Sequence, residues 1–310
     1  MDLIPASFSC PDPLSRAPLA THDAHRPRSR LHVAPSGLQG AIAAILWRDT
    51  RGSNLSDAQR LTHLPASPMV SLAWFQDVDA GRIEQTETGP KWRPLRSPIV
   101  LSGSHSNPSV CWAPAGGRTG MICFHAGAAQ ALFKIDLSAI QDVTVDARDL
   151  LDDSWHALFE SILAADSDAA SLAAIERHIL PRWRSSGHSG SAVASLCGAG
   201  RQWVKRLTWL AYDWRRSNSA RHVERRIKAY SGRSLREWQS LVKTEGLFFN
   251  ARGKFEAGGS LDWAAIAYEE GFADQAHLSR AVKRITGFSP CEFARRFAED
   301  ESFWVYRVWV

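Results

Sequence analysis

The chain has 310 residues, a hydrophobic content of 45% and a formal net charge of +5 at pH 7. This length is enough for two ordinary domains, and the composition is typical of a folded protein rather than of a disordered or fibrous one. No stretch of about 18 apolar residues is present and the N-terminus lacks the basic, then apolar order of a secretory signal, so we expect a cytoplasmic protein without a membrane partner.

The cysteines give no sign of a disulfide framework. Their number is odd, and they are scattered along the chain at Cys10, Cys111, Cys123, Cys197 and Cys291. This usage favours reduced thiols in a large core, and no disulfide is expected.

Positive charge is concentrated in the C-terminal third. Residues 201–310 hold 20 Lys and Arg against 13 Asp and Glu, whereas residues 1–200 hold 17 against 19. A basic segment attached to a nearly neutral one indicates a polyanionic partner for the first and a different task for the second. A solvated basic face without a partner has the same composition and remains the alternative.

Residues 1–200 divide into an arm, a domain and a linker. Residues 1–30 are rich in Pro, Ser, Arg and His, which predicts an irregular arm. Short apolar runs bounded by turn residues follow (GAIAAILW, PMVSLAWF, SPIVLSG, VCWAPAGG, TGMICFHAG), and this pattern predicts the strands of a β-sandwich or barrel. The apolar spacing in AAQALFKI and in SWHALFESILAADSDAASLAAIERHILPRW predicts helices at the end of this domain. We place the domain at residues 31–183. The Gly/Ser-rich residues 184–200 are typical of a linker.

From Arg201 the apolar spacing is helical, and it contains a duplication. SARHVERRIKAYSGRSLREW (219–238) resembles DQAHLSRAVKRITGFSPCEF (274–293) in the order of its His, apolar, Arg, Gly and Ser positions. LDWAAIAYEEGF supplies a helix and a Gly turn before the second copy, which predicts a helix-turn-helix whose second helix enters the major groove of DNA. We therefore predict an all-α DNA-binding domain at residues 201–300, with a helix joining its two units, and a tail at residues 301–310.

The polar side chains of the two copies suit contact with DNA. Arg pairs bidentately with guanine and Gln with adenine, which makes Arg280 and Gln275 candidates for base contacts. Other basic side chains are candidates for phosphate contacts that position the domain. These are Arg226, Lys283, Arg284, Arg295 and Arg296.

The stretch IAYEEGFADQAHLSRAVKRITGFSPCEFARRF resembles the second helix-turn-helix of the AraC/XylS family of transcription regulators. The resemblance lies in its Ala-x-x-x-Gly-Phe turn, its His-Leu-x-Arg helix and its Thr-Gly-x-Ser-Pro-x-Glu-Phe exit. The first copy is similar to the first recognition helix of that family, except that a turn Gly is missing and Leu235 stands where the family has Pro. Over residues 201–297, the resemblance implies base or backbone contacts from Arg221, Arg225, Gln275, Ala276 and Arg280.

The N-terminal domain is similar to the cupin-like or jelly-roll effector domains of a branch of that family, through RLTHLPASPMVSLAWF and ICFHAGAAQALF. Aromatic side chains of a β-sandwich can line an apolar pocket, although core packing is their usual role. Candidates for the pocket walls are Trp47, Trp74, Trp112, Phe124 and His125.

Metal binding and catalysis have less support from the sequence. The candidate metal ligands are His63, His105, Cys111, Cys123 and His125, of which only the last two are close in sequence, so no metal or cofactor is expected. Gly-x-Ser-x-Gly, Gly-x-Gly-x-x-Gly and phosphate-loop motifs are absent, which argues against an enzyme.

Together, these features predict a transcription regulator that binds double-stranded DNA and is controlled by a small-molecule effector in its N-terminal domain. The alternatives are a ligand-independent architectural DNA-binding protein and, with less support, a cupin-like enzyme fused to a DNA-binding domain. The resemblance adds RNA polymerase as a further partner, and the sequence leaves open whether the chain is a monomer or a homodimer.

Overall fold

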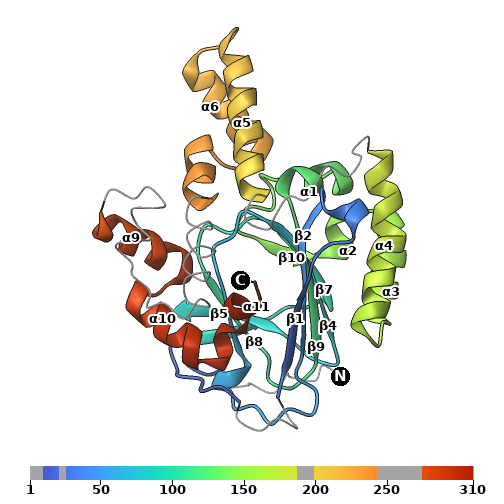
Figure 1. Cartoon of the computed structure of the whole chain (residues 1–310), viewed down its shortest axis with the longest axis vertical. Helices are drawn as coiled ribbons and strands as arrows, with labels where there is room; N and C mark the ends of the chain where they lie inside the picture. The colour runs from blue at the N-terminus through green and yellow to red at the C-terminus, as the bar shows by residue number, and fades with distance from the viewer. Residues whose placement is uncertain (1–9, 21–25, 187–198, 243–273, 310) are drawn as a thin grey trace.

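The computed structural model describes residues 10–20, 26–186, 199–242 and 274–309. An N-terminal part built on β-sheets occupies the centre of the molecule, with its own helices on one side (Figure 1). The C-terminal helices form two groups, one above the sheets and one beside them. The predicted order of a β-rich part followed by an all-α part is confirmed.

Two antiparallel sheets form the N-terminal part. The larger has the strand order β1-β2-β9-β4-β7-β10 and the smaller the order β3-β8-β5-β6. The strands are β1 (Arg28–His32), β2 (Ile42–Asp49), β3 (Leu61–Leu64), β4 (Val70–Gln76), β5 (Gly81–Thr86), β6 (Gly89–Pro94), β7 (Ile99–Ser102), β8 (Ser109–Trp112), β9 (Arg118–Phe124) and β10 (Thr144–Asp146). β1 therefore begins inside the predicted arm, at Arg28.

One face of the larger sheet is covered by helices of the N-terminal part (Figure 1). They are α1 (Ala126–Phe133), α2 (Ala147–Leu150), α3 (His156–Leu163) and α4 (Asp168–Ser185). Leu72 and Trp74 of β4 lie in one buried cluster with Phe159 of α3 and Ile175 of α4. The buried Arg118 of β9 donates to Asp168 over 2.9 Å, which holds the start of α4 against the sheet. None of the helices in the described residues combines the length and apolar character needed to cross a membrane.

The two copies of the duplicated unit begin and end in the same way. In α6 (Ala220–Ser231), Ser219 accepts from the backbone N–H of His222, and in α9 (Gln275–Thr286) Asp274 accepts from that of His277. Both helices end at a glycine with positive φ, 82° for Gly232 and 85° for Gly287, a conformation that glycine adopts without strain. The sequence duplication is thus also a duplication of capping signals.

The remaining described C-terminal helices are α5 (Ala199–Arg215), α10 (Pro290–Glu299) and α11 (Trp304–Trp309). Of the predicted connector, residues 235–242 are helical, and the rest lies outside the described residues, as does the helix predicted before α9. Residues 301–310 were predicted to be a tail, and this is wrong for the part that is described. Phe303, Trp304 and Tyr306 are buried, because α11 packs against β1 and β3.

The apolar core extends from the sheet into the C-terminal helices. Trp203 and Leu207 of α5 and Val223 of α6 belong to the same buried cluster as Trp74. At the junction, the side chain of Gln130 in α1 donates to the backbone carbonyl of Tyr230 in α6 over 3.2 Å. α5 and α6 therefore pack directly on the N-terminal part.

Candidate functional site

The polar faces of α6 and α9 are open to solvent. Val223, Ile227, Leu278 and Val282 are buried on the inner sides of these helices. The five predicted base-contacting residues are all exposed: Arg221, Arg225, Gln275, Ala276 and Arg280. The exposed faces are those that the pattern of apolar residues predicts, and the base contacts themselves remain predictions.

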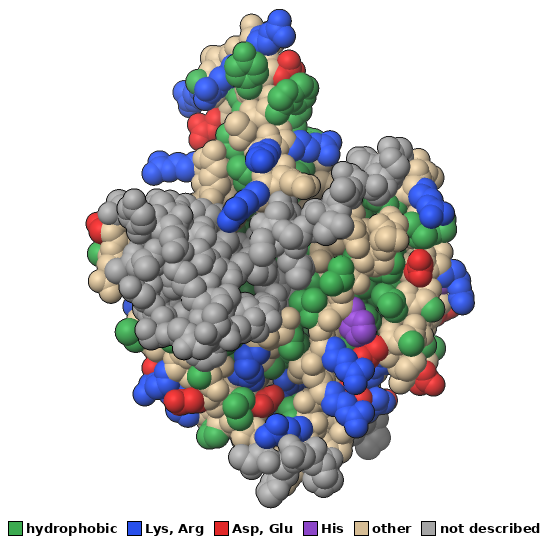
Figure 2. Space-filling view, in the orientation of Figure 1, with side chains coloured by type: hydrophobic (Ala, Val, Ile, Leu, Met, Phe, Trp, Pro, Cys, Tyr) green, Lys and Arg blue, Asp and Glu red, His purple; other side chains and the backbone are tan. Residues whose placement is uncertain are grey.

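Four of the five predicted phosphate contacts are exposed as well. The guanidinium of Arg226 lies 4.1 Å from the ring centroid of Trp214, and Arg284 donates to Ser240 Oγ over 2.7 Å. Lys283 and Arg295 are exposed on α9 and α10, and Arg295 pairs with Glu292. Lys and Arg side chains also project from the region of α5 and α6 at the top of the molecule (Figure 2).

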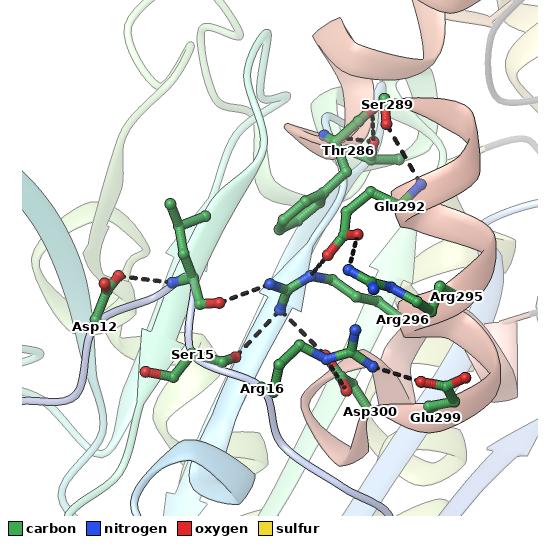
Figure 3. Close-up of polar contacts among 12 residues, drawn as sticks. Asp12, Ser15, Arg16, Thr286, Ser289, Glu292, Arg295, Arg296, Glu299 and Asp300 are labelled. Atoms are coloured by element: carbon green, nitrogen blue, oxygen red, sulfur yellow. Dashed lines mark hydrogen bonds and ion pairs between the residues drawn. The ribbon is translucent and has the colours of Figure 1, made fainter.

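Arg296 does not fit the phosphate contact predicted for it. Its side chain is only 6% exposed and pairs with Glu292 over 2.6 Å and with Asp300 over 3.1 Å. The same guanidinium donates to the backbone carbonyls of Leu14 and Ser15 (Figure 3). Because helical spacing places Arg296 on the same side of α10 as the buried Phe293, it is a structural residue and not part of a DNA surface.

Residues 12–19 of the predicted arm are attached to the end of α10. Arg16 pairs with Glu299 over 2.7 Å and with Asp300 over 2.9 Å (Figure 3). The backbone N–H of Leu19 donates to the carbonyl of Glu299, and that of Glu301 donates to Ala17. This part of the arm therefore contacts the C-terminal end of α10, which the sequence did not predict.

A cavity of about 150 Å³, partly open to solvent, is lined by side chains of both sheets and of the C-terminal helices. Ser71, Ala73 and Phe75 of β4 form part of one wall, and Cys111 of β8 forms part of another. Ile285 from the last turn of α9 and Tyr306 of α11 complete it. A largely apolar cavity with a few polar groups is the usual form of a small-molecule site.

None of the five residues predicted for the pocket walls lines this cavity. Trp47, Trp74 and Phe124 are buried in the cluster beneath the helices, and Trp112 donates from Nε1 to the carbonyl of Asp57. His125 precedes α1, and burial lowers its pKa. Successive side chains of a strand point to opposite faces, so in β4 Leu72 and Trp74 face the helices, whereas Ser71, Ala73 and Phe75 face the cavity.

Three of the candidate metal ligands do line the cavity, namely His105, Cys111 and Cys123. Among the residues that the structure describes, no group of three His, Cys, Asp or Glu side chains has the arrangement of a metal site. Burial raises the pKa of the Cys111 thiol to about 11, and burial followed by the nearby Arg82 lowers the pKa of His105 to about 4. Both groups are therefore neutral at pH 7.

Arg82 of β5 carries the remaining charge at the cavity. It is half-buried, and within the described ranges no carboxylate pairs with it. The nearest acidic residue along the strand, Glu84, pairs instead with Arg93 of β6 over 3.0 Å. Nothing in the sequence distinguished Arg82 from the other cations of the strands.

Two adjoining segments at the cavity contact the C-terminal ends of α6 and α9. The backbones of Ser67 and His105 bond to each other in both directions, at 3.0 and 2.8 Å. Next to Ser67, the backbone N–H of Ala66 donates to the carbonyl of Ile285 in α9 over 2.9 Å. Beside His105, the buried Arg233 that follows α6 donates to the Ser104 carbonyl over 2.7 Å.

No protein-family model matches the chain, and no curated protein matches it. Among solved structures, it is similar to ToxT from Vibrio cholerae O395 (TM-score 0.38, 12% identity, covering 76% of this chain and 95% of that one). It is also similar to ToxT from Vibrio cholerae in a P21 crystal form, with a TM-score of 0.36 and 10% identity, covering 86% of this chain and 97% of that one. The AraC-like transcriptional activator CuxR is a weaker match, with a TM-score of 0.23 and 9% identity, covering 89% of this chain and 86% of that one. Likenesses this weak assign neither a family nor a ligand to the chain.

Proposed function

We propose that the chain is a sequence-specific, DNA-binding transcription regulator of the AraC/XylS type, acting in the cytoplasm and controlled by a small molecule in its N-terminal cavity. In this proposal Arg221, Arg225, Gln275, Ala276 and Arg280 contact base edges or the adjacent backbone. Arg226, Lys283, Arg284 and Arg295 bind phosphates. RNA polymerase is the further partner that such a regulator needs.

The observation that carries the proposal is the shared wall of the cavity. Ile285 belongs to the predicted second recognition helix and also lines the cavity, next to the segment that bonds to it through Ala66. A ligand in this cavity contacts the helix that reads DNA, so its differential affinity for two positions of α9 changes DNA binding. An architectural DNA-binding protein has no need of such a cavity.

Selection of bound sequences from a random duplex pool tests the proposal with the full chain. A regulator of this type enriches two sequence boxes about one helical turn apart, because each helix-turn-helix reads one major groove. Enrichment of no motif contradicts sequence-specific binding and leaves the architectural alternative.

Replacement of Arg280 tests its role on the selected site. Arg280→Ala should cost about 1 to 3 kcal/mol on that site and leave the affinity for random duplex nearly unchanged. Equal losses on both duplexes mean that Arg280 contacts phosphate instead. Thermal unfolding of the variant serves as the control, since Arg280 is exposed and its loss should not lower stability.

A further inference from the structure

The charge of the cavity is set by one side chain. Arg82 lines the cavity, is half-buried and has no carboxylate partner among residues 10–20, 26–186, 199–242 and 274–309. His105 and Cys111, the ionisable groups that interact with it, are neutral at pH 7. A half-buried guanidinium has lost part of its hydration, and a carboxylate restores that loss best because it accepts two parallel N–H bonds.

The rest of the cavity is suited to an apolar body. Met69, Phe75, Met121 and Ile285 contribute apolar walls. Two hydroxyls that also line it, those of Ser102 and Thr144, bond to each other over 2.8 Å and thereby satisfy part of their own hydrogen-bonding capacity. A ligand with many hydroxyl groups, such as a sugar, would leave several of them without partners against these walls, which is costly.

The size of the cavity limits the apolar body. Its volume of about 150 Å³ is close to that of an engineered protein cavity that binds benzene. One ring therefore fills it, and most of a long acyl chain would have to extend out of the cavity into water.

We propose that the effector is a compact organic monoanion, a carboxylate on a body of about one ring, whose carboxylate pairs with Arg82 and whose ring packs against Met121 and Ile285. This inference deepens the proposed function by naming the ligand class of the same cavity. It also explains why a cation stands at the edge of an otherwise apolar site.

Calorimetric titration of the full chain with benzoate tests the proposal, with benzamide as the neutral ligand of the same shape. Benzoate should bind with a stoichiometry of one and raise the melting temperature. Benzamide should bind at least about tenfold more weakly, because it cannot form the charge-assisted pair. Hexadecanoate should not bind more tightly than benzoate.

Two arginines on facing strands provide a matched pair of variants. Arg82→Gln should weaken benzoate binding about tenfold or more and leave benzamide binding nearly unchanged. Arg93 lies directly opposite Arg82 in the β5–β6 register but is exposed and outside the cavity, so Arg93→Gln should bind benzoate like the original chain. Ala73→Leu, which fills the cavity, should remove the binding of both ligands while the protein stays folded.

The proposal is overturned if benzoate shows no saturable binding, if benzamide binds equally well, if Arg82→Gln has no effect, or if hexadecanoate binds more tightly. Its failure is separable from that of the proposed function, because duplex selection can be performed both with and without benzoate. A selected bipartite motif without benzoate binding removes only the ligand class. If benzoate binds but no motif is selected, the proposed function as a transcription regulator is contradicted, and the chain is a carboxylate-binding protein.

Discussion

The backbone N–H of Ala66 and the carbonyl of Ile285 are joined by a 2.9 Å hydrogen bond, and both residues line the same cavity. Ala66 belongs to the segment before β4, and Ile285 is the second-last residue of α9. A movement of α9 therefore either carries the cavity wall at Ala66 with it or breaks this hydrogen bond. Under the proposed function, this pair connects the cavity directly to the predicted second recognition helix.

Shortening Ile285 should weaken the response to ligand. Ile285→Val removes one methyl group from the cavity wall at a cost of about 1 kcal/mol in unfolding free energy. We expect the ligand-induced change in DNA affinity to shrink, as measured by duplex titration with and without ligand. Ile227→Val is the matched control, since Ile227 is equally buried in α6 but outside the cavity. Equal responses in the two variants contradict a role for this wall in coupling.

Arg233 should hold the first helix-turn-helix against the cavity loop. Its guanidinium donates to Ser104 Oγ over 3.0 Å and pairs with Asp142 over 3.3 Å. Arg233→Met removes these buried bonds and should lower the unfolding free energy by about 2 kcal/mol, measured by urea denaturation. The exposed Arg236 lies on the next turn, and Arg236→Met should change stability by less than about 0.5 kcal/mol. Equal stability of the two variants shows that the Arg233 contacts contribute nothing.

Arg296 and Lys283 should separate stability from DNA binding. Arg296→Met removes one partner of a buried pair with Asp300 and should cost about 3 kcal/mol of unfolding free energy. It should leave the salt dependence of DNA affinity unchanged. Lys283→Ala should do the reverse, with near-normal stability and a salt slope lower by about one. A reduced salt dependence of DNA affinity in the Arg296 variant would show that Arg296 contacts phosphate after all.

His63 should make the folded state less stable in acid. Burial, with a smaller contribution from nearby Arg296, lowers the pKa of His63 to about 3, against 6.5 for an unperturbed imidazole. Between these values the unfolded chain binds a proton that the folded chain does not, so unfolding free energy falls as pH decreases below 6.5, by about 1.4 kcal/mol per pH unit. His63→Gln should flatten this slope by about that amount between pH 6 and pH 5. An unchanged slope in urea denaturation curves would show that His63 is protonated in the folded state.

The sequence predicted the elements that have a recognisable apolar pattern and missed those that do not. β2, β4, β7 and β9 were recognisable because they are apolar runs bounded by turn residues. The β5–β6 hairpin was missed, since much of GRIEQTETGPKWRP is exposed and carries no such run. α11 was missed because a short apolar C-terminal stretch has no helical period long enough to recognise.

The residues of the cavity were predicted on the wrong face of the sheet. Large aromatic residues suggest a binding wall, but a cavity needs small side chains that leave space, such as Ser71 and Ala73. In SLAWF these alternate with Leu72 and Trp74, so the small residues marked the cavity face. Arg296 had a similar signal, because its spacing from Phe293 places it on the inner side of α10, whereas Arg295 is turned outward.

Because one buried core extends from the larger sheet into α5 and α6, the two parts of the chain should not be stable when they are expressed separately. Phe159, Trp203 and Val223 belong to one buried cluster. Residues 31–183 expressed alone would expose their share of it to water, at about 25 cal/mol for each Å² of apolar surface. The two halves should therefore behave as a split protein, aggregating separately and regaining structure when mixed. Scanning calorimetry of the intact chain should accordingly show a single endotherm.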